Sequence, residues 1–343
     1  MKARNHRIDL HYHIIPKPYV EALAERGVYG SSYVRFPDWT PEKTLRHMDR
    51  NRVQTAVTSL STPGVWFGDA PLARRLSRLC NEFQAQMIGD HPGRFGALAF
   101  LPLPDVEGAL TELEYAVDGL EHDGVVLLSD TDGCYLGDPE YEELFAELDR
   151  RRAVVFIHPH DDPGTERRYD LFSPLLEWPI HTTRAVMDLL YSGRLSRFPN
   201  IRYILAHGGG SVPYLAHRIA SGFGLDELTR ERNPSVGGDL GWGARPIERL
   251  EESIGVLKGL YYDTASPGRA HLTALQEFVG SDRMVFGTDG GWTPPIQTAQ
   301  TINELTRYDG FDRSQMEAIE RGNALDLFPR LAKGEGVSVV RSA

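Results

Sequence analysis

The sequence is poor in cysteine and lacks long apolar runs, and both features narrow the class of protein. Its 343 residues include two cysteines, Cys80 and Cys134, which are too few for a disulfide framework and lack the spacing of a metal-binding pair. No stretch approaches the roughly 18 consecutive apolar residues of a membrane-spanning helix, and no apolar secretory signal follows Met1. We therefore expect no membrane partner and a location in the reducing cytoplasm.

The sequence also lacks an excess of basic residues. The chain has 37 Lys and Arg residues against 48 Asp and Glu residues, which gives a net charge of -11. Because a nucleic-acid partner requires a basic face, we expect none. The same negative field repels an acidic small molecule at long range, so an acidic substrate requires local arginines.

The chain shows no internal repeat and instead alternates short strand-like segments with helical patterns. Alternating strands and helices predict a parallel sheet, and eight such units predict a single α/β domain over residues 1–343, closed as a (β/α)₈ TIM-like barrel. Longer irregular stretches, at about 27–38, 160–178 and 221–246, are predicted to be inserted active-site loops or subunit contacts. The eight predicted strands are residues 7–10, 54–59, 95–100, 124–128, 153–157, 201–205, 259–263 and 283–286.

Metal-capable side chains follow several of these strands. His11 and His13 belong to the first strand, where alternation turns both to one side and Tyr12 to the other. Barrels of this class carry their chemistry at the C-terminal ends of the strands, where three further candidates lie. Imidazoles and a carboxylate on one rim suit a divalent transition metal such as zinc. The three further candidates are His158 after the fifth strand, His207 after the sixth and Asp289 after the eighth.

Several of these residues have competing interpretations. His160 competes with His158, which we favour because it directly ends an apolar strand. His207 could instead be a structural histidine that bonds to the glycine turn at 208–210, and Asp289 could be a helix cap. Asp9 is expected to be a supporting carboxylate rather than a ligand.

Four motifs in register resemble those of the amidohydrolase superfamily. They are Asp9-Leu10-His11-Tyr12-His13, Phe156-Ile157-His158-Pro159, Leu205-Ala206-His207-Gly208-Gly209-Gly210 and Phe286-Gly287-Thr288-Asp289. The chain resembles more narrowly the aminocarboxymuconate-semialdehyde decarboxylase branch, and within it the 6-methylsalicylate decarboxylase-like group. That group shares the segments Asp123-Gly124-Val125-Val126-Leu127-Leu128 and Tyr135-Leu136-Gly137-Asp138-Pro139.

The resemblance implies roles for individual residues. His207 would lie beside the metal and handle a proton or polarise a metal-bound water. Arg218 matches an arginine that reaches the substrate carboxylate of a neighbouring subunit, which implies a homodimer or a larger homo-oligomer. One divalent metal is expected, with zinc preferred and manganese as the alternative, because no lysine ends the fourth strand to bridge two ions. The ligands that the resemblance implies are His11, His13, His158 and Asp289.

Some positions depart from the pattern of the family and leave the substrate open. The loop after the eighth strand reads Asp289-Gly290-Gly291-Trp292 where relatives commonly have Asp-Tyr-Pro, and His181 stands where relatives often carry an acid. Arg35 is the one possible stand-in for a substrate-binding arginine of the muconate enzyme. Candidates to line an aromatic-accepting pocket are Phe67, Trp178 and Trp292.

Two chemistries fit a site with one metal. The resemblance favours non-oxidative decarboxylation of a small hydroxy-aromatic or related unsaturated carboxylic acid. The alternative is hydrolysis of a lactone, amide or C–C bond by a metal-activated water, with His207 and Asp289 managing the proton in either case. A catalytically inactive barrel that serves as a scaffold is a third class, which the intact ligand set disfavours.

Overall fold

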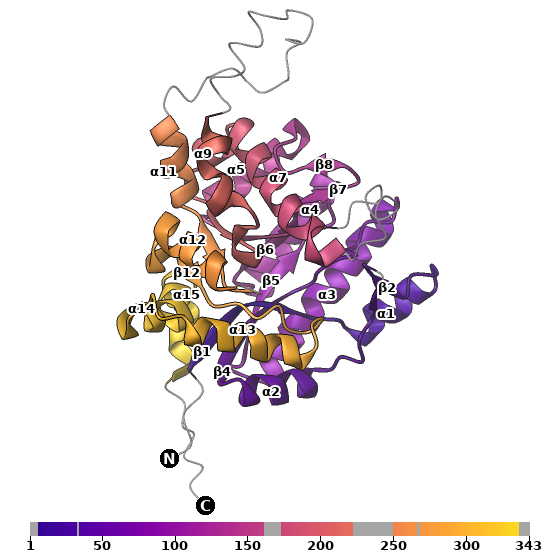
Figure 1. Cartoon of the computed structure of the whole chain (residues 1–343). Coiled ribbons are helices and arrows are strands. Elements are labelled where there is room, and N and C mark those ends of the chain that lie inside the picture. Colours follow the sequence, from indigo (N-terminus) through magenta and orange to yellow (C-terminus); the bar gives the residue numbers. More distant parts are fainter. Residues whose placement is uncertain (1–5, 33, 161–172, 222–249, 266–267, 336–343) are drawn as a thin grey trace, which may run out of the picture.

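Eight parallel strands form one continuous sheet at the centre of the molecule (Figure 1). The computed structural model describes residues 6–32, 34–160, 173–221, 250–265 and 268–335. Chain order is also the order of the strands in the sheet, as consecutive β/α units require. The strands are β1 (Arg7–His13), β4 (Val53–Ser59), β5 (Phe95–Phe100), β6 (Gly124–Leu128), β9 (Val154–His158), β10 (Arg202–Leu205), β11 (Tyr261–Asp263) and β12 (Met284–Val285).

Backbone hydrogen bonds join the last strand to the first. The N–H of Leu10 donates to the carbonyl of Phe286 at 2.9 Å, and the N–H of His13 donates to the carbonyl of Gly290 at 2.7 Å. The two ends of the sheet therefore meet, and the predicted (β/α)₈ barrel is confirmed.

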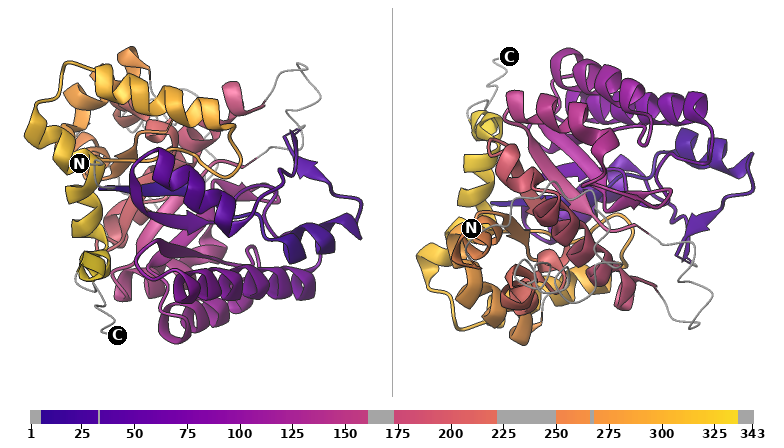
Figure 2. Two further views of the ribbon diagram at one scale, coloured as in Figure 1. Left: turned by 90° about the horizontal axis from the view of Figure 1, so that it is seen from below. Right: turned by 90° about the horizontal axis from the view of Figure 1, so that it is seen from above.

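Helices surround the barrel on its outside, as Figure 1 and the two views of Figure 2 show. The start of α2 is capped by a side chain, because the Thr40 hydroxyl accepts a hydrogen bond from the N–H of Lys43 and the helix begins at Pro41. The helices are α1 (Lys17–Ala24), α2 (Pro41–Arg50), α3 (Ala70–Asp90), α4 (Val106–Glu114), α5 (Glu142–Arg150), α7 (Glu177–Tyr191), α8 (Arg194–Arg197), α9 (Val212–Ala220), α11 (Leu250–Lys258), α12 (Arg269–Val279), α13 (Pro295–Arg307), α14 (Arg313–Glu317) and α15 (Asn323–Leu327).

Several predicted boundaries were wrong. Some strand ends differ by one or two residues, and three differences are larger. Strand β1 continues through His13 instead of ending at Leu10, since it pairs with β4 as far as His13 and Ser59, and the N–H of His13 also donates to the carbonyl of Gly290. The stretch at 27–38 is not wholly irregular, because β2 (Gly30–Ser31) and β3 (Val34–Arg35) pair as a small antiparallel hairpin. The predicted loop at 160–178 runs into α7. Residues 161–172 and 222–249 of the predicted loops lie outside the described residues.

No described helix is both long and apolar enough to cross a membrane. Cys80 is buried in α3 and Cys134 is partly buried, and both are free thiols.

Candidate metal centre

Strand β1 brings two of the predicted ligands together. His11 and His13 are fully buried, and their Nε2 atoms lie 3.1 Å apart. Tyr12 points to the other side, where its hydroxyl lies 3.2 Å from Nδ1 of His47. The predicted alternation is therefore confirmed, and the two imidazoles converge on one point at the mouth of the barrel.

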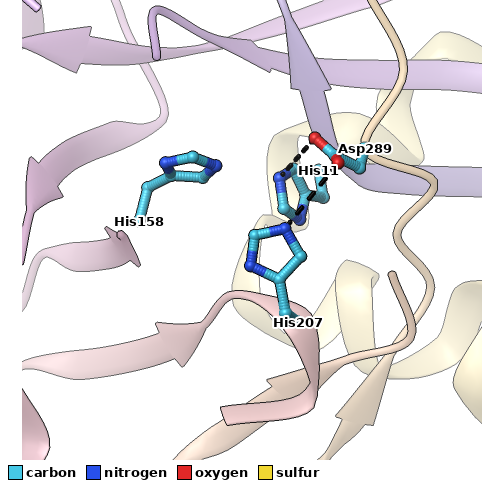
Figure 3. A group of neighbouring side chains, drawn as sticks. All are labelled: His11, His158, His207 and Asp289. Carbon is cyan, nitrogen blue, oxygen red and sulfur yellow. Dashed lines mark ion pairs between the residues drawn. The ribbon is translucent and has the colours of Figure 1, made fainter. Parts of the chain in front are cut away.

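Asp289 lies beside His11 and His207 (Figure 3). Its Oδ1 atom is 3.3 Å from Nε2 of His11 and 3.2 Å from Nε2 of His13. Its Oδ2 atom is 3.7 Å from Nε2 of His207. One carboxylate therefore faces imidazoles from two strands that are far apart in the sequence.

The two glycines after Asp289 explain how its loop approaches β1 so closely. A Cβ atom at Gly290 would collide with the ring of Tyr12, and one at Gly291 would collide with the carbonyl oxygen of His13. Glycine is required at both positions by this close approach of the backbone. The two glycines that replace the Tyr-Pro of relatives therefore allow the loop to lie directly against the first strand.

His158 and His207 complete the group from the ends of β9 and β10 (Figure 3). The Nδ1 atom of His158 hydrogen-bonds to the carbonyl of Pro159 at 2.8 Å. Its Nε2 atom is buried and has no hydrogen-bond partner among the described residues. Nitrogen or oxygen atoms of His11, His158, His207 and Asp289 all lie within 4.8 Å of one another, a spacing that one metal ion can bridge.

The positions of His160 and His207 bear on two alternatives that the sequence left open. His160 lies outside this group, and its backbone N–H donates to Oγ of Ser129 at 3.0 Å. His207 lies inside the group, so it is placed both to bind a metal and to handle a proton beside it. The division of these tasks between His207 and His13 remains a prediction.

Burial and charge set the protonation of the group. Burial alone would lower the pKa of His11, but the carboxylates of Asp263 and Asp289 raise it to about 10. Burial would raise the pKa of Asp289, but His11 and its neighbours hold it well below its usual value. Burial lowers the pKa of His158 well below its usual range. An ionised carboxylate and a neutral imidazole are the forms that bind metals. Asp289 and His158 are therefore in that form, whereas His11 would have to lose a proton when an ion binds.

Asp263, the last residue of β11, is a part of the site that the sequence analysis missed. Its Oδ2 atom lies 2.5 Å from Nδ1 of His11, and its Oδ1 atom accepts a hydrogen bond from the N–H of Gly208 at 3.0 Å. The carboxylate therefore orients one candidate ligand and also holds the turn that carries His207. The available signal was an acidic residue at the end of the seventh predicted strand.

Two other polar residues support the histidines. Oγ of Ser59 lies 3.2 Å from Nδ1 of His13, and Oγ of Ser61 lies 3.5 Å from Nδ1 of His158. Asp9 accepts hydrogen bonds from the N–H of His11 and the N–H of Thr288, both at 3.1 Å. This arrangement agrees with the supporting role expected for Asp9.

The predicted aromatic residues fall into two groups. The ring of Trp178 lies 5.6 Å from the ring of His158 and 5.9 Å from that of His207, so Trp178 forms one wall of the site. Trp292 instead packs against Phe36, with ring centroids 5.5 Å apart. Phe67 is partly buried against the core.

The predicted arginines lie away from this cluster within the described chain. Arg35 in β3 and Arg218 in α9 are both exposed, and no contact joins either to a histidine of the site. His181 is buried, with Nδ1 at 3.9 Å from Oδ1 of Asp130 and 3.4 Å from the hydroxyl of Tyr135. The position that often carries an acid in relatives therefore holds a buried histidine that faces the carboxylate of Asp130.

Known proteins share this fold and much of this sequence. A family model described as amidohydrolase matches residues 8–330. The decarboxylase yanB of Aspergillus niger is 34% identical over 94% of this chain and 88% of its own length. A 6-methylsalicylic acid decarboxylase of Penicillium expansum is 34% identical over 95% of this chain and 97% of its own. These matches agree with the resemblance carried by the four motifs.

A solved structure supports the fold independently. A dihydroxybenzoic acid decarboxylase from Polaromonas, with bound manganese and the inhibitor 2-nitroresorcinol, superposes with a TM-score of 0.76 at 22% identity. The match covers 97% of this chain and 100% of that chain, so the two share one barrel from end to end.

Proposed function

The chain belongs to the amidohydrolase family, and we propose that it is a metal-dependent, non-oxidative decarboxylase of a small hydroxy-aromatic carboxylic acid. Relatives that match it over nearly their whole length are decarboxylases, and 6-methylsalicylic acid is itself an aromatic hydroxy acid. The single observation that carries the proposal is the buried group of His11, His158, His207 and Asp289 at the mouth of the barrel.

The residues of this group fit a divalent metal. The Nε2 atom of His158 is buried without a partner among the described residues, which costs free energy unless a ligand binds it. We propose that His11, His13, His158 and Asp289 hold the ion. Zinc is our first choice because imidazoles suit it, and manganese is the alternative because the Polaromonas enzyme binds it. The ion would stabilise negative charge on the substrate's oxygens.

The residues of the chain then have separate tasks. Decarboxylation breaks the bond between the ring carbon and the carboxylate, and its electron pair stays on the ring while CO₂ leaves. A proton must take the place of the carboxylate on that carbon. His207 lies beside Asp289 with 12% of its side chain exposed, so we assign these two residues to holding and delivering the proton. Trp178 covers one side of the site and limits the access of water.

A panel of substrates tests the proposed function. The metal-loaded protein is incubated with ortho-hydroxybenzoates and, separately, with aryl lactones, while released CO₂ and released acid are measured. We expect CO₂ from at least one hydroxybenzoate and no hydrolysis of the lactones. Hydrolysis without CO₂ release would show that the site activates water instead, and the proposed function would be wrong.

The metal content gives a second prediction. We expect about one divalent ion per chain after metal-replete expression, because the donors converge on one point and no lysine ends β6. Elemental analysis measures the ion, and reconstitution of the chelated protein with zinc or manganese tests which of them restores activity. Two ions per chain, or none, would contradict the assignment.

We further propose that the enzyme is a homodimer or a larger homo-oligomer in which Arg218 acts across the subunit boundary. Arg218 is exposed on α9, one turn after Tyr214, which is itself 85% exposed. A large exposed aromatic residue beside an arginine fits a contact between subunits. Arg218, or Arg35 from the hairpin, would then bind the remaining negative charge of the substrate.

Mixing two inactive variants tests the shared site. Arg218→Ala is combined with His158→Ala and the chains are allowed to exchange. Random exchange of a dimer should restore about a quarter of the wild-type activity, since half of the dimers are hybrids with one complete site. No recovery, with exchange verified by mass spectrometry of labelled chains, would rule out a contribution across the boundary.

We also propose a cellular compartment and the binding partners of the protein. Two free thiols suit a reducing environment, and we propose the cytoplasm. Besides further copies of the chain, the partner we propose is the carboxylic acid substrate, with no nucleic acid, since the net charge is -11.

A further inference from the structure

The turn that carries His207 has an unusual backbone. Four successive residues, His207, Gly208, Gly209 and Gly210, have positive φ angles of 53°, 61°, 72° and 60°. A side chain other than glycine is strained in this region, so His207 keeps the conformation only where its surroundings hold it. We call residues 207–210 the His207 turn.

Contacts from separate elements hold this turn. Asp263 accepts the N–H of Gly208, and the ring of Tyr262 packs against Gly209 so closely that a Cβ atom there would collide with it. A Cβ atom at Gly210 would collide with the carbonyl oxygen of Pro179 in α7. These contacts lie on β11 and α7, and none of them binds the carbonyl of Gly208.

His271 in α12 binds that carbonyl. Its Nε2 atom lies 3.2 Å from the carbonyl oxygen of Gly208, and the imidazole ring fills the space that a Cβ atom at Gly208 would occupy. The backbone of Gly208 is therefore held on both sides: Asp263 binds its N–H, and His271 binds its carbonyl. Asp263 also contacts His11, whereas His271 has no contact with the candidate metal ligands among the described residues other than through this turn.

We infer that His271 is a positioning residue that fixes the His207 turn and thereby aims the His207 side chain at Asp289. The inference rests on the proposed role of His207 in proton transfer. A proton-transfer group must lie within hydrogen-bond reach of its target, so loss of the bond to Gly208 should slow the chemical step. It should leave metal binding intact, since His271 binds neither the ion nor its ligands.

Hydrogen exchange tests the inference without any assumption about the reaction. In His271→Ala, the amides of the peptide that contains residues 207–211 should exchange roughly tenfold faster than in the wild type, as expected for the loss of one partly buried hydrogen bond. Exchange in the central strands should not change. The control is Glu277→Ala, an exposed substitution on the same helix, which should leave the exchange of the turn as it is.

Kinetics supply the second arm. His271→Ala should lower kcat by roughly 10- to 100-fold with KM and metal content nearly unchanged, and His271→Gln should recover most of kcat because its amide donates to the same carbonyl. Gly208→Ala should harm the wild type more than it harms His271→Ala, since the collision with the ring is removed.

The exchange and kinetic experiments distinguish a failure of this inference from a failure of the proposed function. If the wild type releases no CO₂ from any hydroxybenzoate, the proposed function fails, and the exchange experiment still decides whether His271 holds the turn. Unchanged exchange at 207–211 in His271→Ala would overturn the inference. A uniform rise in exchange across the barrel would also overturn it, because His271 would then serve general stability.

Discussion

The His158→Ala variant is expected to lose its activity and most of its bound metal. His158 is buried at the end of β9 with a neutral imidazole, because burial lowers its pKa well below the usual range. Its Nε2 atom has no hydrogen-bond partner among the described residues and is free to bind a cation. Residues that only support metal ligands cost about 10- to 100-fold in affinity when removed, so loss of a ligand should cost at least as much. Metal content and kcat measured on one preparation test this expectation.

His160→Ala is the matched control. The two histidines are separated by one residue, but the side chain of His160 is not part of the metal group, and its bond to Ser129 uses the backbone N–H, which alanine retains. We therefore expect near-normal metal content and a much smaller loss of activity. If His160→Ala lost the metal and His158→Ala kept it, the sequence and the geometry would both have pointed to the wrong histidine.

Local patterns in the sequence predicted the barrel well. Alternating strand and helix periods are properties of short segments, and they predicted all eight strands of the sheet. The end of β1 was missed because it depends on pairing with β4 as far as Ser59 and on a hydrogen bond from His13 to Gly290, contacts that a local pattern does not contain. The hairpin of β2 and β3 was missed because each strand has two residues, too few for a visible alternation.

The candidate ligands could be predicted for a similar reason. His11 and His13 share one strand, so alternation alone places their side chains together, and the remaining candidates end strands of the same barrel. Asp263 could not be paired with His11 in this way, because 252 residues separate them and the contact depends on how β11 lies against the centre of the barrel. Trp178 was one of several tryptophans in the sequence, and only the path of α7 shows that it faces the histidines.

Recognition of the substrate depends on residues outside the metal group. Arg35 and Arg218 are exposed on β3 and α9, at the surface of the described chain. The tasks proposed for these arginines depend on contacts with a second subunit and with the bound acid. The complementation experiment addresses assembly, and the substrate panel addresses the acid.

The His207→Ala variant is expected to keep most of its metal and to lose roughly 10²–10⁴ in kcat, the usual range for removal of a proton-transfer group. His207 lies 3.7 Å from Asp289 and retains an exposed edge of 12%, which suits a residue that meets the substrate. The other donors, from His11, His13, His158 and Asp289, still converge when His207 is removed. A fall in kcat with the ion in place therefore assigns His207 to the proton.

The control for His207→Ala is His217→Ala, which removes an exposed histidine from the neighbouring helix α9 and should change neither metal content nor kcat. His207 also lies among the four residues whose donor atoms fall within 4.8 Å of one another, so a ligand role is the rival assignment. Metal content separates the two. If the ion is lost together with activity in His207→Ala, His207 is a ligand, and the proton must be delivered by Asp289 or by a group that the substrate brings.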